Sequence, residues 1–268
     1  MKLIGSLLLI FFLLLSCKVQ RVQPSFVKFI STKDSIAVVT KNVFNSPAFV
    51  TTINNATNQS SYFQLRPLEE KKIMTFNKAE ASKNSILKKV SFKQQYGYHE
   101  THLQHYDTLY NYQLPYLKQA KYKIIQGYNG TFTHNTFVSR YTLDFNTQIG
   151  DTIVASRGGV VLKTIMHHNK QGVSSRFRPY ANYIVIYHRD NTIAQYVHLK
   201  QHSNLVKVGD TVETNQPIAL SGFTGLTTEP HLHFGVFKSN RKGIYSIPII
   251  LDAIPAKNYK KNNYYLND

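Results

Sequence analysis

The sequence predicts an all-β protein, in which a small N-terminal β-sandwich-like domain precedes a larger antiparallel β domain. Short apolar runs rich in Val, Ile, Phe and Thr recur along the chain, and Asn, Ser, Asp and Gly turns separate them, a pattern typical of strands. Tyrosine and phenylalanine are plentiful, with 18 and 16 residues, and tryptophan is absent. The sequence shows no amphipathic helix of any length between residues 122 and 255. A chain of 268 residues has room for two such domains, each with its own core.

The chain begins with "MKLIGSLLLIFFLLLSCKVQ", in which one lysine precedes an apolar run from Leu3 to Leu15. This run is too short to span a bilayer comfortably, and it fits the central part of a secretory signal. Its ending, "LLSC", resembles a bacterial lipobox, which implies that residues 1–17 are a lipoprotein signal peptide and that Cys17 is lipidated. A plain signal peptide or an N-terminal anchor helix is the alternative. Cys17 is the only cysteine, which excludes structural disulfides and thiolate metal sites.

Residues 18–26 form a short tether, and residues 27–92 form the N-terminal β domain. Its predicted strands are "SIAVVTKNV", "PAFVTTINN", "SYFQLRP", "KKIMTFN" and "SILKKVSF". No histidine occurs before His99, and this half of the chain contains no recognisable chemistry.

Residues 93–121 are a polar, tyrosine-rich linker, in which His99, His102 and His105 recur at every third position. This spacing invites a metal-binding interpretation, but it also marks one face of a short helix, and nothing nearby completes a ligand set. A linker packed against the next domain is therefore favoured. Residues 122–255 form the second domain, and residues 256–268, "AKNYKKNNYYLND", form a polar tail that we expect to be frayed.

The formal net charge of +18 should attract polyanions, such as nucleic acid, anionic cell-wall polymer or lipid headgroups. The N-terminal signal decides between these partners, because it places the protein outside the cytoplasm, where nucleic acid is not expected. We therefore expect no nucleic-acid partner. The expected location is the bacterial cell envelope, where a lipid anchor holds a periplasm-facing protein at the membrane.

The candidate chemistry lies in the second domain. In "EPHLHF", His231 and His233 alternate along a predicted strand, so their side chains share one face while Leu232 faces the core. "YVHL" places His198 at a strand end, and "YTLDF" places Asp144 between apolar residues, where an unpaired carboxylate would be costly to bury. His134 lies in a polar loop just upstream. A catalytic zinc takes three protein N or O ligands and one open position, which two histidines and one aspartate would satisfy.

Residues from about 122 to 240 resemble the M23 family of zinc peptidases, the lysostaphin- and LytM-type peptidoglycan endopeptidases. The similar stretches, in the family's order, are "QGYNGTFTH", "YTLDF", "GDTIVASRGGVV", "NYIVIYHRDNTIAQYVHL", "VKVGDTV", "QPIALSGFTG" and "PHLHF". The resemblance implies an M23/LytM-type peptidase domain that binds Zn²⁺ through His134, Asp144 and His233. It also implies that His198 and His231 are the catalytic histidine pair. The interval of ten residues between His134 and Asp144 is longer than the family's commonest spacing.

The function implied by the resemblance is hydrolysis of the peptide cross-links of peptidoglycan, with its stem peptides as substrate. One of the two catalytic histidines would take the proton while the other stabilises the oxyanion. The loops "FRPYANY" and "HHNKQG" are expected to wall the cleft, with His167 and His168 as surface residues. A protein regulator is possible, and its identity is unknown.

Two alternatives to this enzyme stay open. One is a catalytically silent LytM-type domain that binds cell wall or activates an amidase partner. The other is a lipoyl- or biotinyl-type carrier, because "VKVGDTVETNQPIALSG" has a similar hairpin rhythm, although no lysine stands at the hairpin tip.

Overall fold

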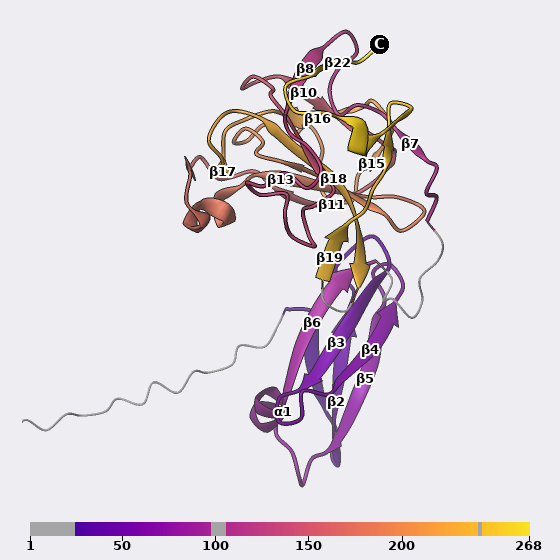
Figure 1. Cartoon of the computed structure of the whole chain (residues 1–268). Helices are drawn as coiled ribbons and strands as arrows, with labels where there is room; N and C mark the ends of the chain where they lie inside the picture. Colours follow the sequence, from indigo (N-terminus) through magenta and orange to yellow (C-terminus); the bar gives the residue numbers. More distant parts are fainter. Residues whose placement is uncertain (1–24, 98–105, 241–242) are drawn as a thin grey trace, which may run out of the picture.

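The computed structural model describes residues 25–97, 106–240 and 243–268 (Figure 1). The predicted signal peptide with Cys17, nearly all of the tether, and the spaced histidines His99, His102 and His105 lie outside these residues. In the part of the chain that is described, no helix is both long and apolar enough to cross a membrane.

The N-terminal unit consists of two three-stranded antiparallel sheets and one helix (Figure 1). Its elements are β1 (Val27–Ser31), β2 (Ser35–Lys41), β3 (Ala48–Asn54), β4 (Ser60–Leu65), β5 (Glu70–Asn77), α1 (Lys83–Lys89) and β6 (Val90–Tyr96). The sheet orders are β1-β2-β5 and β4-β3-β6. Val38 of the first sheet lies in a core cluster with Ile86 of α1, and Phe92 of the second sheet packs against this cluster. That the two sheets form a sandwich stays a prediction.

One strand prediction in this unit was wrong, because residues 83–89 form α1 and only the following residues are extended. The backbone N–H of Ser85 donates to Ser82 Oγ at 3.2 Å, and the N–H of Ser82 donates to Ser85 Oγ at 2.8 Å. This reciprocal capping box satisfies two donors at the helix start, while Lys88 and Lys89 lie in the last turn, where cations are favourable. The short apolar run therefore begins as a helix.

The second unit is built on a nine-stranded sheet with the order β15-β11-β13-β14-β18-β9-β8-β22, in which β19 also pairs with β18. Its strands are β8 (Lys121–Gln126), β9 (Thr142–Phe145), β11 (Gly159–Ile165), β13 (Tyr183–Tyr187), β14 (Ile193–Val197), β15 (Thr211–Val212), β18 (Leu232–Asn240), β19 (Gly243–Ser246) and β22 (Tyr264–Leu266). Neighbouring strands in this sheet are antiparallel throughout. The prediction of an all-β protein with antiparallel sheets is confirmed.

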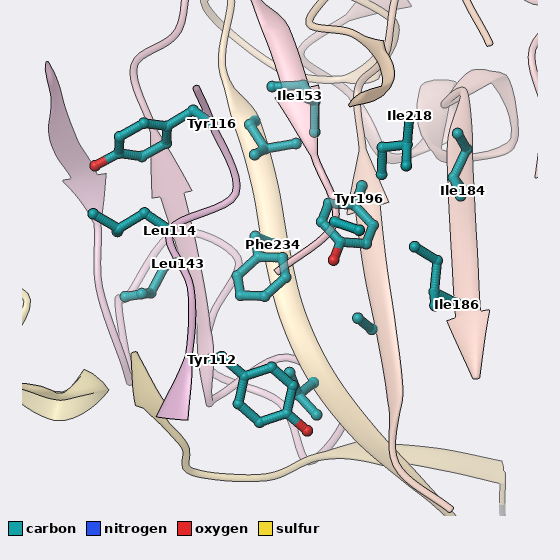
Figure 2. Close-up of a cluster of buried hydrophobic side chains, with 14 of the residues drawn as sticks. Tyr112, Leu114, Tyr116, Leu143, Ile153, Ile184, Ile186, Tyr196, Ile218 and Phe234 are labelled. Carbon is teal, nitrogen blue, oxygen red and sulfur yellow. The ribbon is translucent and has the colours of Figure 1, made fainter. Parts of the chain in front are cut away.

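Short elements surround this sheet. They are β7 (Asn111–Tyr112), β10 (Thr152–Val154), β12 (Gln171–Gly172), η2 (Ser175–Tyr180), β16 (Pro217–Leu220), β17 (Gly225–Leu226), β20 (Ile250–Leu251), β21 (Ile254–Pro255) and η3 (Ala256–Asn258). Figure 2 shows the apolar core that joins β7, β10 and β16 to the sheet, with Tyr196 and Phe234 near its centre, and β20 and η3 also contribute to this core. Tyr112, Leu114 and Tyr116, from the stretch predicted to be a linker, are buried in the same core.

The tail is not frayed, contrary to the prediction. Residues 264–266 form β22, which pairs with β8 at the edge of the large sheet. Tyr259 is 2% exposed, and its ring stacks on that of Tyr265 at a centroid distance of 4.2 Å. Its hydroxyl donates to the carbonyl of Leu251 at 3.1 Å. Backbone pairing and aromatic burial therefore order a segment whose composition is polar.

The N-terminal unit packs against one face of the large sheet, next to β19 (Figure 1). Phe44 and Tyr96 contact a buried cluster that includes Val185 and Tyr187 of β13. Ser239 Oγ, near the end of β18, donates to the carbonyl of Tyr96 at 2.7 Å. An apolar contact and a hydrogen bond therefore join the two units.

Candidate metal centre

Four neighbouring strands place Asp144 and His233 in one row across the sheet, with Gln126 at one end and His198 next to the other. Asp144 on β9 lies opposite His233 on β18, and Gln126 on β8 lies opposite Asp144. On the other side, His233 lies opposite Val197 of β14, and His198 follows directly. Residues far apart in the chain become neighbours because strand pairing fixes their register.

The alternation of side chains separates this row from the core. Leu143 and Phe145 on either side of Asp144 are buried in the apolar cluster, as are Leu232 and Phe234 on either side of His233. Asp144 and His233 therefore point to the opposite face of the sheet. The prediction that Leu232 faces the core between two histidines is confirmed.

His134, Asp144 and His233 bring three ligand atoms together. His134 Nε2 lies 3.2 Å from Asp144 Oδ1 and 3.2 Å from His233 Nδ1, and the distance from His233 Nδ1 to Asp144 Oδ1 is 2.8 Å. Ligands of a tetrahedral zinc with bonds of about 2.1 Å lie roughly 3.4 Å apart. Two imidazole nitrogens and one carboxylate oxygen at this spacing fit a zinc ion and leave a fourth position for another ligand.

Partners outside the triad orient its ligand atoms. His134 is fully buried, and its Nδ1 lies 3.0 Å from the carbonyl of Gly127, so Nδ1 carries the proton and Nε2 presents its lone pair to the other ligands. Asp144 Oδ2 accepts a hydrogen bond from Gln126 Nε2 at 2.9 Å. The same amide nitrogen donates to Thr133 Oγ1 at 2.8 Å, and this bond ties the loop before His134 to β8.

His198 and His231 lie side by side next to the triad, with a distance of 4.5 Å between ring centroids. His198 Nδ1 donates to the carbonyl of Thr224 at 2.6 Å, and His231 Nδ1 donates to the carbonyl of Glu229 at 2.9 Å. His231 Nε2 lies 3.8 Å from Asp144 Oδ1. In both rings the proton on Nδ1 is held by the backbone, so Nε2 is the nitrogen that can accept a proton or hydrogen-bond a substrate.

His198 adopts an uncommon backbone conformation, with φ of +67° directly after β14. Few residues other than glycine occupy this left-handed region, although Asn, Asp and His do so more often than most, and such conformations often accompany functional geometry. Here the turn aims the ring at Thr224 and His231.

Burial and mutual charge control protonation at the site. Burial would raise the pKa of Asp144, but the three surrounding histidines lower it well below its usual value. Burial, together with His231 and His233, lowers the pKa of His198 well below its usual value. Burial also lowers the pKa of His233, although Asp144 opposes this shift. An ionised carboxylate and neutral imidazoles are the forms that bind metal and accept protons near neutral pH.

The site opens into a cavity of about 910 Å³. Asp144, His198, His231 and His233 line it, whereas His134 lies behind this wall. The predicted loop "FRPYANY" contributes Arg178 and Ala181 to the lining. Among the described lining residues none comes from "HHNKQG", so the expectation that this loop walls the cleft was wrong for this cavity.

The structure thus brings five predicted site residues together, namely His134, Asp144, His198, His231 and His233. His167 and His168 instead contact each other, with ring centroids 3.9 Å apart, and His167 is exposed. The site features not predicted are Gln126 and the backbone carbonyls of Gly127, Thr224 and Glu229, which accept hydrogen bonds from the histidine rings. Gln126 lies in "QGYNGTFTH", one of the stretches similar to M23 peptidases, whereas backbone acceptors leave no residue-type signal.

Comparison with known proteins agrees with this geometry. The model of Peptidase family M23 matches residues 139–244, a region that contains Asp144, His198, His231 and His233. His134 lies just before the matched region, and it is the fold that brings its Nε2 to Asp144.

Several proteins are similar over this part of the chain. An uncharacterized metalloprotease of Buchnera aphidicola is 36% identical over 128 residues, covering 46% of this chain and 30% of that protein. The peptidoglycan DD-endopeptidase ShyB of Vibrio cholerae is 36% identical over 127 residues, covering 46% of this chain and 27% of that protein. The solved catalytic domain of lysostaphin from Staphylococcus simulans is 26% identical, with a TM-score of 0.32, covering 48% of this chain and 83% of that domain.

The similar region spans less than a third of the length of these two full-length relatives. Within it, the family match and the relatives named as metalloproteases and peptidoglycan endopeptidases agree with one another. Residues 139–244 of the chain therefore match Peptidase family M23.

Proposed function

We propose that the chain is a zinc-dependent endopeptidase that hydrolyses the peptide cross-links of peptidoglycan. The observation that supports this most directly is the convergence of His134 Nε2, Asp144 Oδ1 and His233 Nδ1 beside a cavity, next to two oriented histidines. The similar proteins of Vibrio cholerae named peptidoglycan DD-endopeptidases support this choice of substrate.

His134, Asp144 and His233 would hold the zinc, which supplies Lewis acidity for activating water and polarising the scissile carbonyl. Residues of the chain supply the charge and the orientation of the ligand set. Asp144 contributes the negative charge of the ligand set, and Gln126 fixes the carboxylate through Oδ2. The carbonyl of Gly127 fixes the orientation of the His134 ring by accepting a hydrogen bond from its Nδ1.

His198 and His231 would handle the proton and the oxyanion. Each ring presents Nε2, because its Nδ1 proton is held by a backbone carbonyl. One ring accepts the proton of the attacking water at Nε2, and the other stabilises the developing oxyanion when its own Nε2 is protonated, because an oxyanion needs an N–H donor. The lowered pKa of His198 favours the neutral form of that ring.

The location is also part of the proposal. The lipobox-like ending at Cys17 would anchor the protein to a membrane of the bacterial envelope, where its charge of +18 favours an anionic surface. The stem peptides of peptidoglycan would be the substrate, with no nucleic-acid partner.

Digestion of purified peptidoglycan by the soluble chain, followed by identification of the released fragments, tests this function. We expect wild type to release cross-link fragments. We expect His231→Ala to keep its zinc and to lose roughly 10²-fold or more in rate, because it lacks a proton-transfer or oxyanion group. His233→Ala should lose both the metal and the activity, whereas the exposed His167→Ala should retain both.

Two outcomes would count against the proposal. Wild type that binds zinc but releases no fragment would favour the silent LytM-type domain, which binds cell wall or activates an amidase. Equal loss of metal from His231→Ala and His233→Ala would overturn the division into ligands and catalytic histidines.

A further inference from the structure

The cavity beside the candidate metal centre is also lined by four cationic side chains that form no ion pair among the described residues. Arg178 from η2, and Lys257, Lys260 and Lys261 from the segment that begins in η3, line it together with Asp144 and His233. None of the ion pairs among described residues involves these four cations. Glu229 is the one other acidic residue among the described lining residues, and its carboxylate accepts a hydrogen bond from Asn146 Nδ2 at 3.1 Å.

The lysine segment is held firmly against the elements of the site. The ring of Tyr259, between Lys257 and Lys260, packs edge-on against Phe145, which directly follows Asp144, at a centroid distance of 6.5 Å. The N–H of Lys260 donates to the hydroxyl of Tyr265 at 2.9 Å. The N–H of Asn262 donates to the carbonyl of Ile124 on β8 at 2.8 Å.

The same segment approaches the residue that orients His134. A Cβ added to Gly127 would lie 2.9 Å from the carbonyl oxygen of Tyr259, so only glycine fits this approach without a shift. The carbonyl of Gly127 accepts the hydrogen bond from His134. The lysine segment therefore lies against Gly127, the residue whose carbonyl orients the ligand His134.

We propose that Lys257, Lys260 and Lys261 form a carboxylate-recognition subsite, which selects substrate peptides bearing a free carboxylate near the scissile bond. Three ammonium groups on an ordered segment, none of them in an ion pair among the described residues, make a complementary surface for such a group. The cavity joins this surface to the metal centre, so a peptide bound at one can reach the other. This inference rests on the proposed peptidase function and adds a specificity determinant to it.

The test measures binding, so that it does not depend on cleavage. The probe is a soluble peptidoglycan stem peptide without a cross-link, in two forms, one with free carboxylates and one with every carboxylate amidated. Affinities are measured for wild type, for K257Q/K260Q/K261Q, and for a control, K33Q/K72Q/K88Q. The control removes the same charge from exposed positions in the N-terminal unit that do not line the cavity.

Wild type and the control should bind the free-carboxylate peptide about fivefold or more tightly than the amidated one, because only the free carboxylates can form ion pairs with the lysines. K257Q/K260Q/K261Q should bind both forms with the same weak affinity. Equal affinity of wild type for both forms would overturn the subsite, as would an unchanged preference in K257Q/K260Q/K261Q. Absence of peptidoglycan cleavage by wild type, measured separately, would contradict the peptidase function. The binding measurement would still decide whether the lysines recognise a carboxylate.

Discussion

His134, His198 and His231 share one arrangement, in which Nδ1 of the ring lies 3.0, 2.6 and 2.9 Å from a backbone carbonyl. This contact selects the tautomer that leaves Nε2 free on the side of the site. His233 differs, because its own Nδ1 faces Asp144. A backbone acceptor is present whatever the side chain of its residue, so it holds the ring reliably and cannot be recognised from residue types.

His188 illustrates a buried histidine without a place in the site. It is fully buried, its Nδ1 lies 2.9 Å from the carbonyl of Gly158, and its Nε2 has no partner among the described residues. Burial is the main cause that lowers the pKa of His188 to about 4. The unfolded chain, with a histidine pKa near 6.5, therefore takes up this proton before the folded chain does.

The contribution of neutral His188 to stability should be fully present above about pH 6.5 and should be lost as the pH falls toward 4. Over this range the lowered pKa corresponds to roughly 3 kcal/mol of unfolding free energy. We expect His188→Gln to lose correspondingly less stability between pH 6.5 and 4 than wild type. Urea unfolding at several pH values, with a metal chelator present throughout, measures the difference.

The exposed His167→Gln serves as the control and should follow the wild-type pH dependence. If His188→Gln and wild type lose the same stability over this pH range, burial of a neutral His188 is not the source of the acid sensitivity.

At the scale of elements, the sequence predicted most where side-chain alternation decides the structure. In "HLH" the period of two was sufficient to place Leu232 in the core and both histidines on the other face. The same holds for Asp144 between Leu143 and Phe145. Register across strands was not predictable in this way, because it depends on which strands pair.

Local capping and tertiary contacts explain the errors. Residues 85–89 resemble a strand by composition, but the reciprocal bonds of Ser82 and Ser85 start a helix there. The tail is polar in composition, yet Tyr259 is buried and β22 pairs with β8. Composition reports the average polarity of a segment and misses the one or two anchoring residues that order it.

The whole molecule places its N-terminal unit on the same sheet face as the site. On β14, Ile193 contacts the interface cluster, whereas Gln195 and Val197, which share its face, line the cavity. Burial raises the pKa of Tyr96 to about 12, and the hydrogen bond of its hydroxyl with Gln195 opposes this shift. The interface therefore reaches the edge of the cavity.

Phe44 provides a test of how strongly the interface stabilises the chain. Its ring contacts Tyr96 edge-on at 5.4 Å and packs against the buried cluster of β11, β13 and β14. We expect Phe44→Ala to lower the unfolding free energy by about 1–3 kcal/mol, because it exposes this apolar surface. Neighbouring Val43 is 50% exposed, so Val43→Ala should change stability by no more than about 0.5 kcal/mol. Thermal unfolding that is equally affected by both variants would mean that the interface contributes little.

The central claim is that His134, Asp144 and His233 together bind a single zinc ion. Titration of zinc into metal-free protein, with a competing chelator of known affinity, tests it most directly. We expect one tight site per wild-type chain, and loss of that site in each of the single variants His134→Ala, Asp144→Ala and His233→Ala, while His198→Ala retains it. A wild-type chain without a tight site, or a His134→Ala variant that binds zinc as tightly as wild type, would contradict the claim.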